Sequence, residues 1–186
     1  MSVNLAKHSF TVSEYERMGE ADVFPPDARF ELIEGEIIEM SPIGSRHAAC
    51  VNIISDVFNK QLRGKSIVRT QSPIVLDDFS EPEPDVAILK FREDYYREAH
   101  PRPNDILMVI EVAETTVPYD RHVKMRLYSR AGIPEYLILN LPEDLLEYHS
   151  QPEMGEYQTT RTLKRGDRFE SAAVAGLSLD IETILG

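Results

Sequence analysis

Cysteine is nearly absent from this chain of 186 residues, because Cys50 is the only one. A single thiol excludes an internal disulfide and a cysteine-rich zinc site, so we expect a reducing compartment, namely the cytoplasm. Long apolar runs are also missing: the longest, Ile106 to Val112, is too short to cross a bilayer and contains Glu111. The segment from Met1 to Phe10 lacks the basic-then-apolar profile of an export signal. We therefore expect no association with membranes.

Basic residues are scarce as well. The chain has 20 Lys and Arg against 32 Asp and Glu, which gives a net charge of −12. A protein that neutralises phosphates usually has a basic footprint, so this balance argues against nucleic acid as a partner. The acids of the first half lie in two stretches, as they would around a divalent cation or in solvated acidic loops. These acids are Glu31, Glu34, Glu36, Glu39, Asp77, Asp78, Glu81, Glu83 and Asp85.

The rest of the composition is that of an ordinary folded protein, with 42% apolar and 28% charged residues. The length suits one domain with a real core. No internal repeat, low-complexity tract or Gly/Ser-rich linker divides the chain. We therefore expect a single domain over residues 1–186.

Local patterns predict three elements in the N-terminal third. The capping-box pattern at Thr11 predicts a short helix over residues 11–18. Alternating apolar and polar residues over 29–40 predict a β-hairpin with its turn at Glu34-Gly35. Ser45 can cap a long helix that ends at Gly64. The apolar stripe of that helix is Ala48, Val51, Ile54, Phe58 and Leu62.

The remaining sequence alternates strands and helices. A helix from Asp120 to Ala131-Gly132 precedes a strand at Pro134–Asn140, so that strand should run parallel to the one before the helix. Residues 91–102 suggest a short helix plus a loop, and β segments follow Leu145 on both sides of Met154-Gly155. Together these elements predict an α/β (α+β) fold, a mixed sheet flanked by helices. The earlier strands are expected at Ile67–Leu76, Pro84–Leu89 and Asp105–Val112.

Two acids lie where a purely structural explanation is difficult. Asp85 stands at the start of one apolar strand, and Glu111 interrupts the most apolar strand of the chain. A buried carboxylate is costly unless a cation pairs with it or a metal binds it. If the strands are neighbours, both acids can reach one cation, and Mg²⁺ favours such a pair. The alternatives are a strand-entry role for Asp85 and a buried ion pair for Glu111, perhaps with Lys124.

Lys124 is the best candidate for the cation that phosphodiester hydrolysis requires. The i, i+4 spacing places Asp120, Lys124 and Tyr128 on one face of the helix. The alternative for Lys124 is a partner of Asp120 on an exposed helix, but we favour the catalytic role. Asp120 suits the helix N-cap position. Tyr128 could line the site or pack on the sheet.

Here the sequence resembles the Uma-two family of "putative restriction endonucleases", which belongs to the PD-(D/E)xK nuclease superfamily. The likeness is carried by residues 83–88, 109–116 and 119–136, and its specific part is the block from Asp85 to Tyr136. The resemblance extends from Phe30 through His47 to the motif that ends at Asp180. It implies a restriction-endonuclease-like fold, a Mg²⁺- or Mn²⁺-dependent nuclease, DNA as substrate and a homodimer. It also implies that Asp85 and Glu111 are metal ligands.

One position departs from the superfamily pattern. Ala113 stands where a lysine is expected, two residues after Glu111. The resemblance implies that the lysine has moved to the following helix, which makes Lys124 its substitute. A chain that had lost its lysine would look similar, so the rival interpretation is a catalytically inactive nuclease fold that serves as a binding or assembly module. Action on RNA is a weaker alternative, because no RNA-reading motif is present.

Several other residues are accessory candidates. Gln71 precedes Asp85 in the chain and could reach the same cleft, or simply face solvent. His47 near the start of the long helix could contact a phosphate or metal, or be an ordinary helical histidine. Glu34 and Glu36 could supply an accessory ligand, or be surface acids beside a turn. A basic rim for DNA would consist of Arg46, Lys60, Arg63, Lys65 and Arg69.

Overall fold

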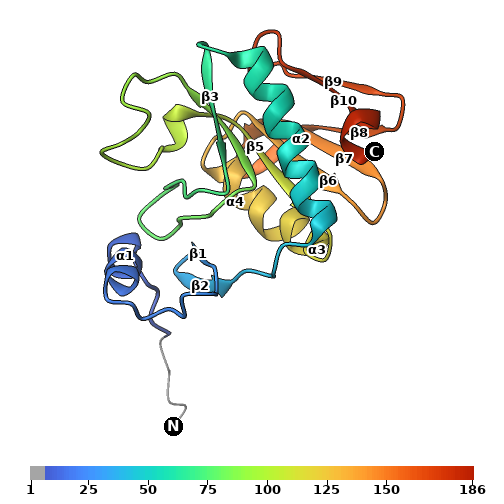
Figure 1. Ribbon diagram of the computed structural model, residues 1–186. Helices are drawn as coiled ribbons and strands as arrows, with labels where there is room; N and C mark the ends of the chain where they lie inside the picture. The colour runs from blue at the N-terminus through green and yellow to red at the C-terminus, as the bar shows by residue number, and fades with distance from the viewer. Residues whose placement is uncertain (1–6) are drawn as a thin grey trace.

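The computed structural model describes residues 7–186 and has a six-stranded mixed sheet at its centre (Figure 1). The strand order is β3-β4-β5-β6-β7-β8. Strands β5 and β6 are parallel, and the other neighbours are antiparallel. This arrangement confirms the predicted mixed sheet and the parallel pair. The strands are β3 (Ser66–Thr70), β4 (Val86–Lys90), β5 (Ile106–Ala113), β6 (Glu135–Asn140), β7 (Leu145–Glu153) and β8 (Glu156–Lys164).

Helices cover both faces of this sheet (Figure 1). Helix α2 (Ser45–Leu62) packs on one face, where its stripe meets Met108, Ile110 and Val112 of β5. The opposite face carries one helical segment composed of α3 (Val117–Tyr119), a π-helical turn η2 (Asp120–Lys124) and α4 (Met125–Arg130). Because side chains alternate along a strand, Glu111 points to the face opposite Ile110 and Val112. The strand period thus directs Glu111 toward the helical segment that carries Lys124.

The N-terminal part lies below the sheet in Figure 1. Helix α1 (Val12–Glu20) has the predicted capping box, in which Thr11 and Glu14 bond reciprocally. Strands β1 (Phe30–Ile33) and β2 (Glu36–Glu39) form the predicted antiparallel hairpin. Gly35 takes φ +82° at its turn, and a Cβ there would lie 2.6 Å from the Cβ of Ser9. This position therefore requires glycine.

The C-terminal part completes the α2 side of the molecule. The turn between β7 and β8 falls at Met154-Gly155 as predicted, and a short hairpin follows, formed by β9 (Arg168–Glu170) and β10 (Ser178–Asp180). The last helix, α5 (Ile181–Leu185), packs against α2, where the Cys50 thiol donates to the Ile184 carbonyl at 3.2 Å. Cys50 is a buried free thiol.

Four local predictions were wrong. The strand expected at Ile67–Leu76 ends at Thr70, because Gln71 turns the chain with φ +42°. Ser45 is the first residue of α2, and Gly44 occupies the N-cap position without a side-chain bond. Residues 91–102 form turns, and the only helical turn nearby in the described chain is the 3₁₀ turn η1 (Pro103–Asp105).

The fourth correction concerns Asp120. It does not begin the helix, since the helical segment starts three residues earlier at Val117 and Thr116 occupies the cap position.

Within residues 7–186, no helix has both the length and the apolar character needed to span a membrane. The segment Met1–Phe10, predicted to lack an export signal, begins outside the described residues.

Candidate functional site

The strand ends of β4 and β5 open into a pocket of about 300 Å³. It is lined by the ends of these strands, by the residues before α3 and parts of α3 and η2, and by the β1–β2 hairpin with the connection to α2. Asp85, Glu111 and Lys124 all line this pocket. The structure therefore brings together the three residues that the sequence singled out, although they come from two strands and a helix.

Lys124 is buried between two carboxylates. Its Nζ lies 3.1 Å from Glu111 Oε1 and 3.1 Å from Glu31 Oε2. Only 4% of Lys124 and 4% of Glu111 are exposed. The exposed helix considered for Lys124 is therefore wrong, whereas the ion pair with Glu111 is present. A π-helical turn such as η2 is rare and often marks a functional site.

Asp85 is held by contacts from three directions. Its Oδ2 accepts the backbone N–H of Val112 at 2.8 Å. Its Oδ1 lies 2.8 Å from Nε2 of His47 and accepts the amide of Gln71 at 3.3 Å. The turn that ends β3 early is what brings Gln71 to this carboxylate. Two of the accessory candidates, His47 and Gln71, thus contact Asp85.

Two further residues support the site from the helical segment. The Tyr128 hydroxyl donates to Glu111 Oε1 at 2.8 Å, so this residue both contacts the site and packs on the sheet. Asp120 is buried and lines the pocket, and its Oδ2 accepts the Thr116 hydroxyl at 2.6 Å. Its side chain accepts from the hydroxyl of the residue at the cap position and does not cap the helix itself.

The electrostatics of the pocket are dominated by an excess of acids. Burial raises the pKa of Glu111 to about 8, although the Lys124 ammonium lowers it. Burial also raises the pKa of Asp120 to about 6. For Lys124, burial alone lowers the pKa, but the surrounding carboxylates, led by Glu111 and Glu31, outweigh it and raise the pKa. The amine therefore stays protonated and acts as a hydrogen-bond donor.

A family model described as "Putative restriction endonuclease" matches residues 12–182. The chain belongs to this family, Uma2. The match covers the hairpin, both strands of the site and the helical segment with Lys124. The resemblance noted in the sequence is thereby confirmed, and the site described above lies within the matched residues.

A solved structure has the same fold as this Uma2 chain. It comes from Anabaena variabilis ATCC 29413 and is described as a putative nuclease belonging to DUF820. The likeness covers 95% of this chain and 97% of the other, with 14% sequence identity and a TM-score of 0.72. A comparison with curated proteins gives no match. The structural likeness establishes the nuclease-like fold.

Sequence reasoning missed Glu31 as a site residue. It appeared only among the acidic stretches, yet it is 3% exposed and contacts Lys124. Its position on β1 of the hairpin, opposite Ile38, turns its side chain inward, and only the docking of the hairpin over the sheet reveals this. The signal available in the sequence was an acid inside an apolar strand, Phe30–Ile33, which is the same signal that identified Glu111.

Other candidates lie away from the pocket. Glu36 is exposed and lies 3.7 Å from Lys7, while Glu34 pairs with Arg130 at 2.5 Å. None of the five residues proposed as a basic rim lines the pocket. Arg46 pairs with Asp144 and Lys60 with Asp56, so these charges are already engaged.

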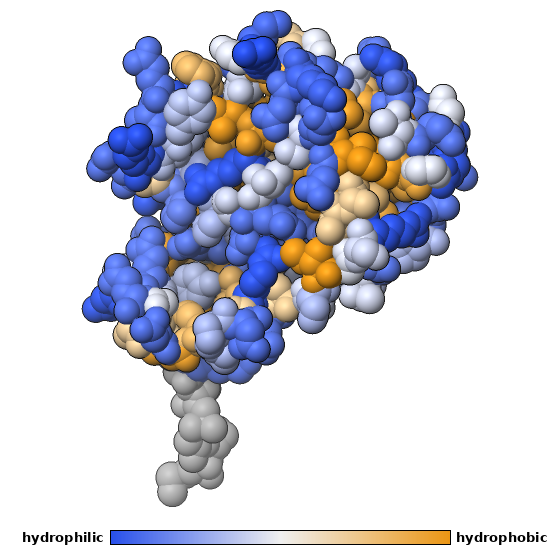
Figure 2. Space-filling model, in the orientation of Figure 1, coloured by the Kyte–Doolittle hydropathy of each residue, from blue (hydrophilic) through white to orange (hydrophobic). Residues whose placement is uncertain are grey.

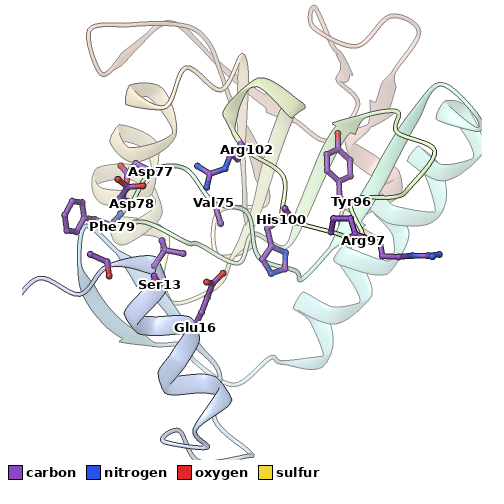
Figure 3. Close-up of a pocket in the computed structure, with 14 residues that line it drawn as sticks. Ser13, Glu16, Val75, Asp77, Asp78, Phe79, Tyr96, Arg97, His100 and Arg102 are labelled. Atoms are coloured by element: carbon purple, nitrogen blue, oxygen red, sulfur yellow. Dashed lines mark hydrogen bonds between the residues drawn. The ribbon is translucent and has the colours of Figure 1, made fainter.

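A larger hollow of about 700 Å³ lies between α1 and the segments around Asp77 and His100 (Figure 3). Glu16, Asp78 and Arg102 line it together with apolar side chains. It contains none of the site residues predicted from the sequence. The pocket at the strand ends is therefore the candidate site of this Uma2 chain.

Proposed function

We propose that this chain is a divalent-metal-dependent nuclease that hydrolyses phosphodiester bonds in DNA. The observation that supports it is the meeting of Asp85 and Glu111, from adjacent antiparallel strands, with the Lys124 amine in one pocket. Membership of a family described as "Putative restriction endonuclease" supports the same reaction class. The nuclease-like fold provides the scaffold, while the side chains carry the functional argument.

The residues present suit a magnesium or manganese ion. Within residues 7–186, no three His, Cys, Asp or Glu side chains form a ready-made metal cage. Mg²⁺ does not require one, because it keeps several waters and binds through one or two carboxylates plus substrate phosphate. Asp85 and Glu111 supply these hard oxygen ligands, and the surplus of buried acids in the pocket is the charge such a cation would neutralise.

In the proposed reaction, a water oxygen bonds to phosphorus while a P–O ester bond breaks. One hydrogen of the water ends on the leaving oxygen, and the other is lost to solvent or stays on the new phosphate. A bound divalent cation supplies water activation and charge neutralisation. Lys124 remains protonated, so it orients the water or a phosphate oxygen by hydrogen bonding and does not serve as the base. His47 and Gln71 hold the Asp85 carboxylate in place.

The test is cleavage of plasmid DNA in Mg²⁺ by the wild type and by Asp85→Ala. We expect the substitution to abolish cleavage. The matched control is Asp78→Ala, which removes an exposed aspartate that does not line the pocket and should leave cleavage unchanged. Cleavage that survives Asp85→Ala contradicts the site assignment.

The second candidate function is a non-catalytic binding or assembly module. The observation that favours it is Ala113, which stands in the usual lysine position and is fully buried. Calorimetric titration with Mg²⁺ separates the two functions. A nuclease should bind Mg²⁺ and lose this binding in Glu111→Gln, whereas a module has no reason to bind the ion at this pocket. A homodimer and a cytoplasmic location remain part of the proposal.

A further inference from the structure

The lining of the pocket at the strand ends combines charged and apolar side chains. Strand β2 and the connection from β2 to α2 contribute four apolar residues, together with Glu39 and Ser41. Glu31 of β1 lies directly across from Ile38 in the hairpin, so the apolar residues adjoin the acids. Ile43 is 39% exposed, and Figure 2 shows an orange patch beside the start of α2. The four apolar residues are Ile38, Met40, Pro42 and Ile43.

Tyr119 lines the same pocket and has an unusual hydroxyl. The oxygen is buried and has no hydrogen-bond partner among the described residues. Buried polar groups in folded proteins are nearly always paired, and an exception calls for a ligand or water.

The cations of the pocket are poorly placed to hold a long duplex. Among residues 7–186, only two Lys or Arg residues line it, Arg29 and Lys124. Arg29 pairs with Glu83 at 2.5 Å, and Lys124 is held by two carboxylates. Duplex binding depends on the neutralisation of many phosphates. Recognition at this pocket must therefore use contacts other than a row of basic side chains.

From these observations we propose that the pocket accepts one unpaired nucleotide of DNA. The base lies against Ile38, Met40 and Ile43, and the Tyr119 hydroxyl donates to a polar atom of the nucleotide. The inference rests on the proposed nuclease function and adds a substrate class to it, namely single-stranded or locally unpaired DNA. A pocket of about 300 Å³ holds a small molecule and not a duplex. A paired base would first have to leave its stack, which costs energy that an unpaired base does not require.

The first experiment compares cleavage of three oligonucleotides of one sequence by the full chain in Mg²⁺. They are a single strand, a perfect duplex and a duplex with an unpaired bulge. We expect the single strand and the bulge to be cut about tenfold faster or more than the duplex, since extruding a base costs a few kcal/mol. Equal or faster cutting of the duplex, with all cutting lost in Asp85→Ala, overturns the inference and leaves the nuclease function standing.

The second experiment measures binding without cleavage, so it decides the inference even if no substrate is cut. A single strand that contains 2-aminopurine is titrated in EDTA, and its fluorescence reports the environment of the base. Ile43→Ser should weaken binding about fivefold or more, because it removes apolar surface from the base. The matched control is Val23→Ser, which removes an exposed aliphatic side chain elsewhere, 57% exposed.

The third variant, Tyr119→Phe, separates recognition from folding. It removes a hydroxyl that is buried without a partner, so thermal stability should stay equal or rise. Single-strand affinity should nevertheless fall about fivefold, as expected for one lost hydrogen bond. Wild-type affinity in both Ile43→Ser and Tyr119→Phe, or duplex binding as tight as single-strand binding, contradicts the inference.

Discussion

At the scale of single residues, burial decides the chemistry of this protein. Glu31, Glu111 and Lys124 would be ordinary surface charges if they were solvated. Beneath the hairpin, the Lys124 ammonium instead lies buried between the Glu31 and Glu111 carboxylates. Breaking such a buried arrangement leaves an uncompensated charge, so each member is tied to the others. The effect of burial on these carboxyl groups can be measured through the pH dependence of Mg²⁺ binding and of stability.

The affinity for Mg²⁺ should increase as the pH rises. Burial raises the pKa of Glu111 to about 8, so below that pH a proton competes with the metal for the carboxylate. We expect Mg²⁺ binding, measured by calorimetry, to tighten by up to about tenfold per pH unit between pH 6 and pH 8 and to level off above. A flat profile contradicts the role of Glu111 as ligand.

The Glu81 carboxyl should make the protein less stable at high pH. Its Oε2 is buried without a partner among the described residues, and burial together with the charge of Glu16 raises its pKa from 4.5 to about 7. A raised pKa in the folded state favours folding below pH 4.5, and this contribution disappears as the pH rises through 7.

Glu81→Gln should therefore be more stable than the wild type at pH 8, on the order of 1–3 kcal/mol, with little or no gain at pH 5. Urea denaturation at the two pH values measures the free energy of unfolding. The control is Glu153→Gln, an exposed acid, which should show no such difference. An equal effect of Glu81→Gln at both pH values contradicts the prediction.

At the scale of elements, the β1–β2 hairpin has a role beyond local structure. It carries Glu31 into the pocket and leads into the apolar wall before α2. It is attached to the segment between β3 and β4 by the antiparallel bridge of Leu32 with Glu81 and by the Gly35 N–H, which donates to the Phe79 carbonyl at 2.8 Å, while Ser9 of the N-terminal segment packs on Gly35. Its docking is therefore coupled to the geometry around Lys124.

Gly35→Ala should lower both stability and nuclease activity. Alanine at φ +82° is strained by about 1–2 kcal/mol, and its Cβ would also collide with Ser9. Gly64→Ala is the matched control, since Gly64 has φ +74° but no atom within 4 Å of the added Cβ. We expect Gly64→Ala to show the strain alone and to keep its cleavage rate. Thermal unfolding and plasmid cleavage measure the two effects, and equal losses in both variants contradict the coupling.

At the scale of the whole molecule, the net charge of −12 opposes a polyanionic substrate. The pocket offers two cations, and Arg46 and Lys60 are already paired with acids. Any long-range attraction to DNA must therefore be weak. A homodimer, which the sequence resemblance implies and which remains a prediction, would change this by placing two such surfaces side by side.

The dependence of DNA binding on salt should be shallow. Each neutralised phosphate contributes a slope of about −0.7 to −0.9 in log K against log salt, so two cations predict a slope between about −1.4 and −1.8. Fluorescence anisotropy with a labelled strand over a range of KCl measures it. A slope several times steeper would show a broad basic surface, and light scattering would then test whether a dimer provides it.

The sequence alone determined most of the elements and singled out the candidate residues for the chemistry. Periodicity predicted the hairpin, the long helix and the apolar strands, because burial imposes a period of two on strands and three to four on helices. Asp85, Glu111 and Lys124 were identifiable because charges in apolar surroundings need a reason. Boundaries were less predictable: Gln71 adopts a positive φ, and the helix expected to begin at Asp120 begins at Val117.

Only the tertiary structure decided what these residues face. An exposed helix remained an alternative for Lys124 until the packing of the hairpin placed Glu31 3.1 Å from its amine. Likewise, His47 and Gln71 were weak candidates until both were found at the Asp85 carboxylate. These contacts join residues far apart in the chain, and a local pattern contains no information on how separate elements dock. The period of a strand gives the direction of a side chain, but its partner depends on the whole fold.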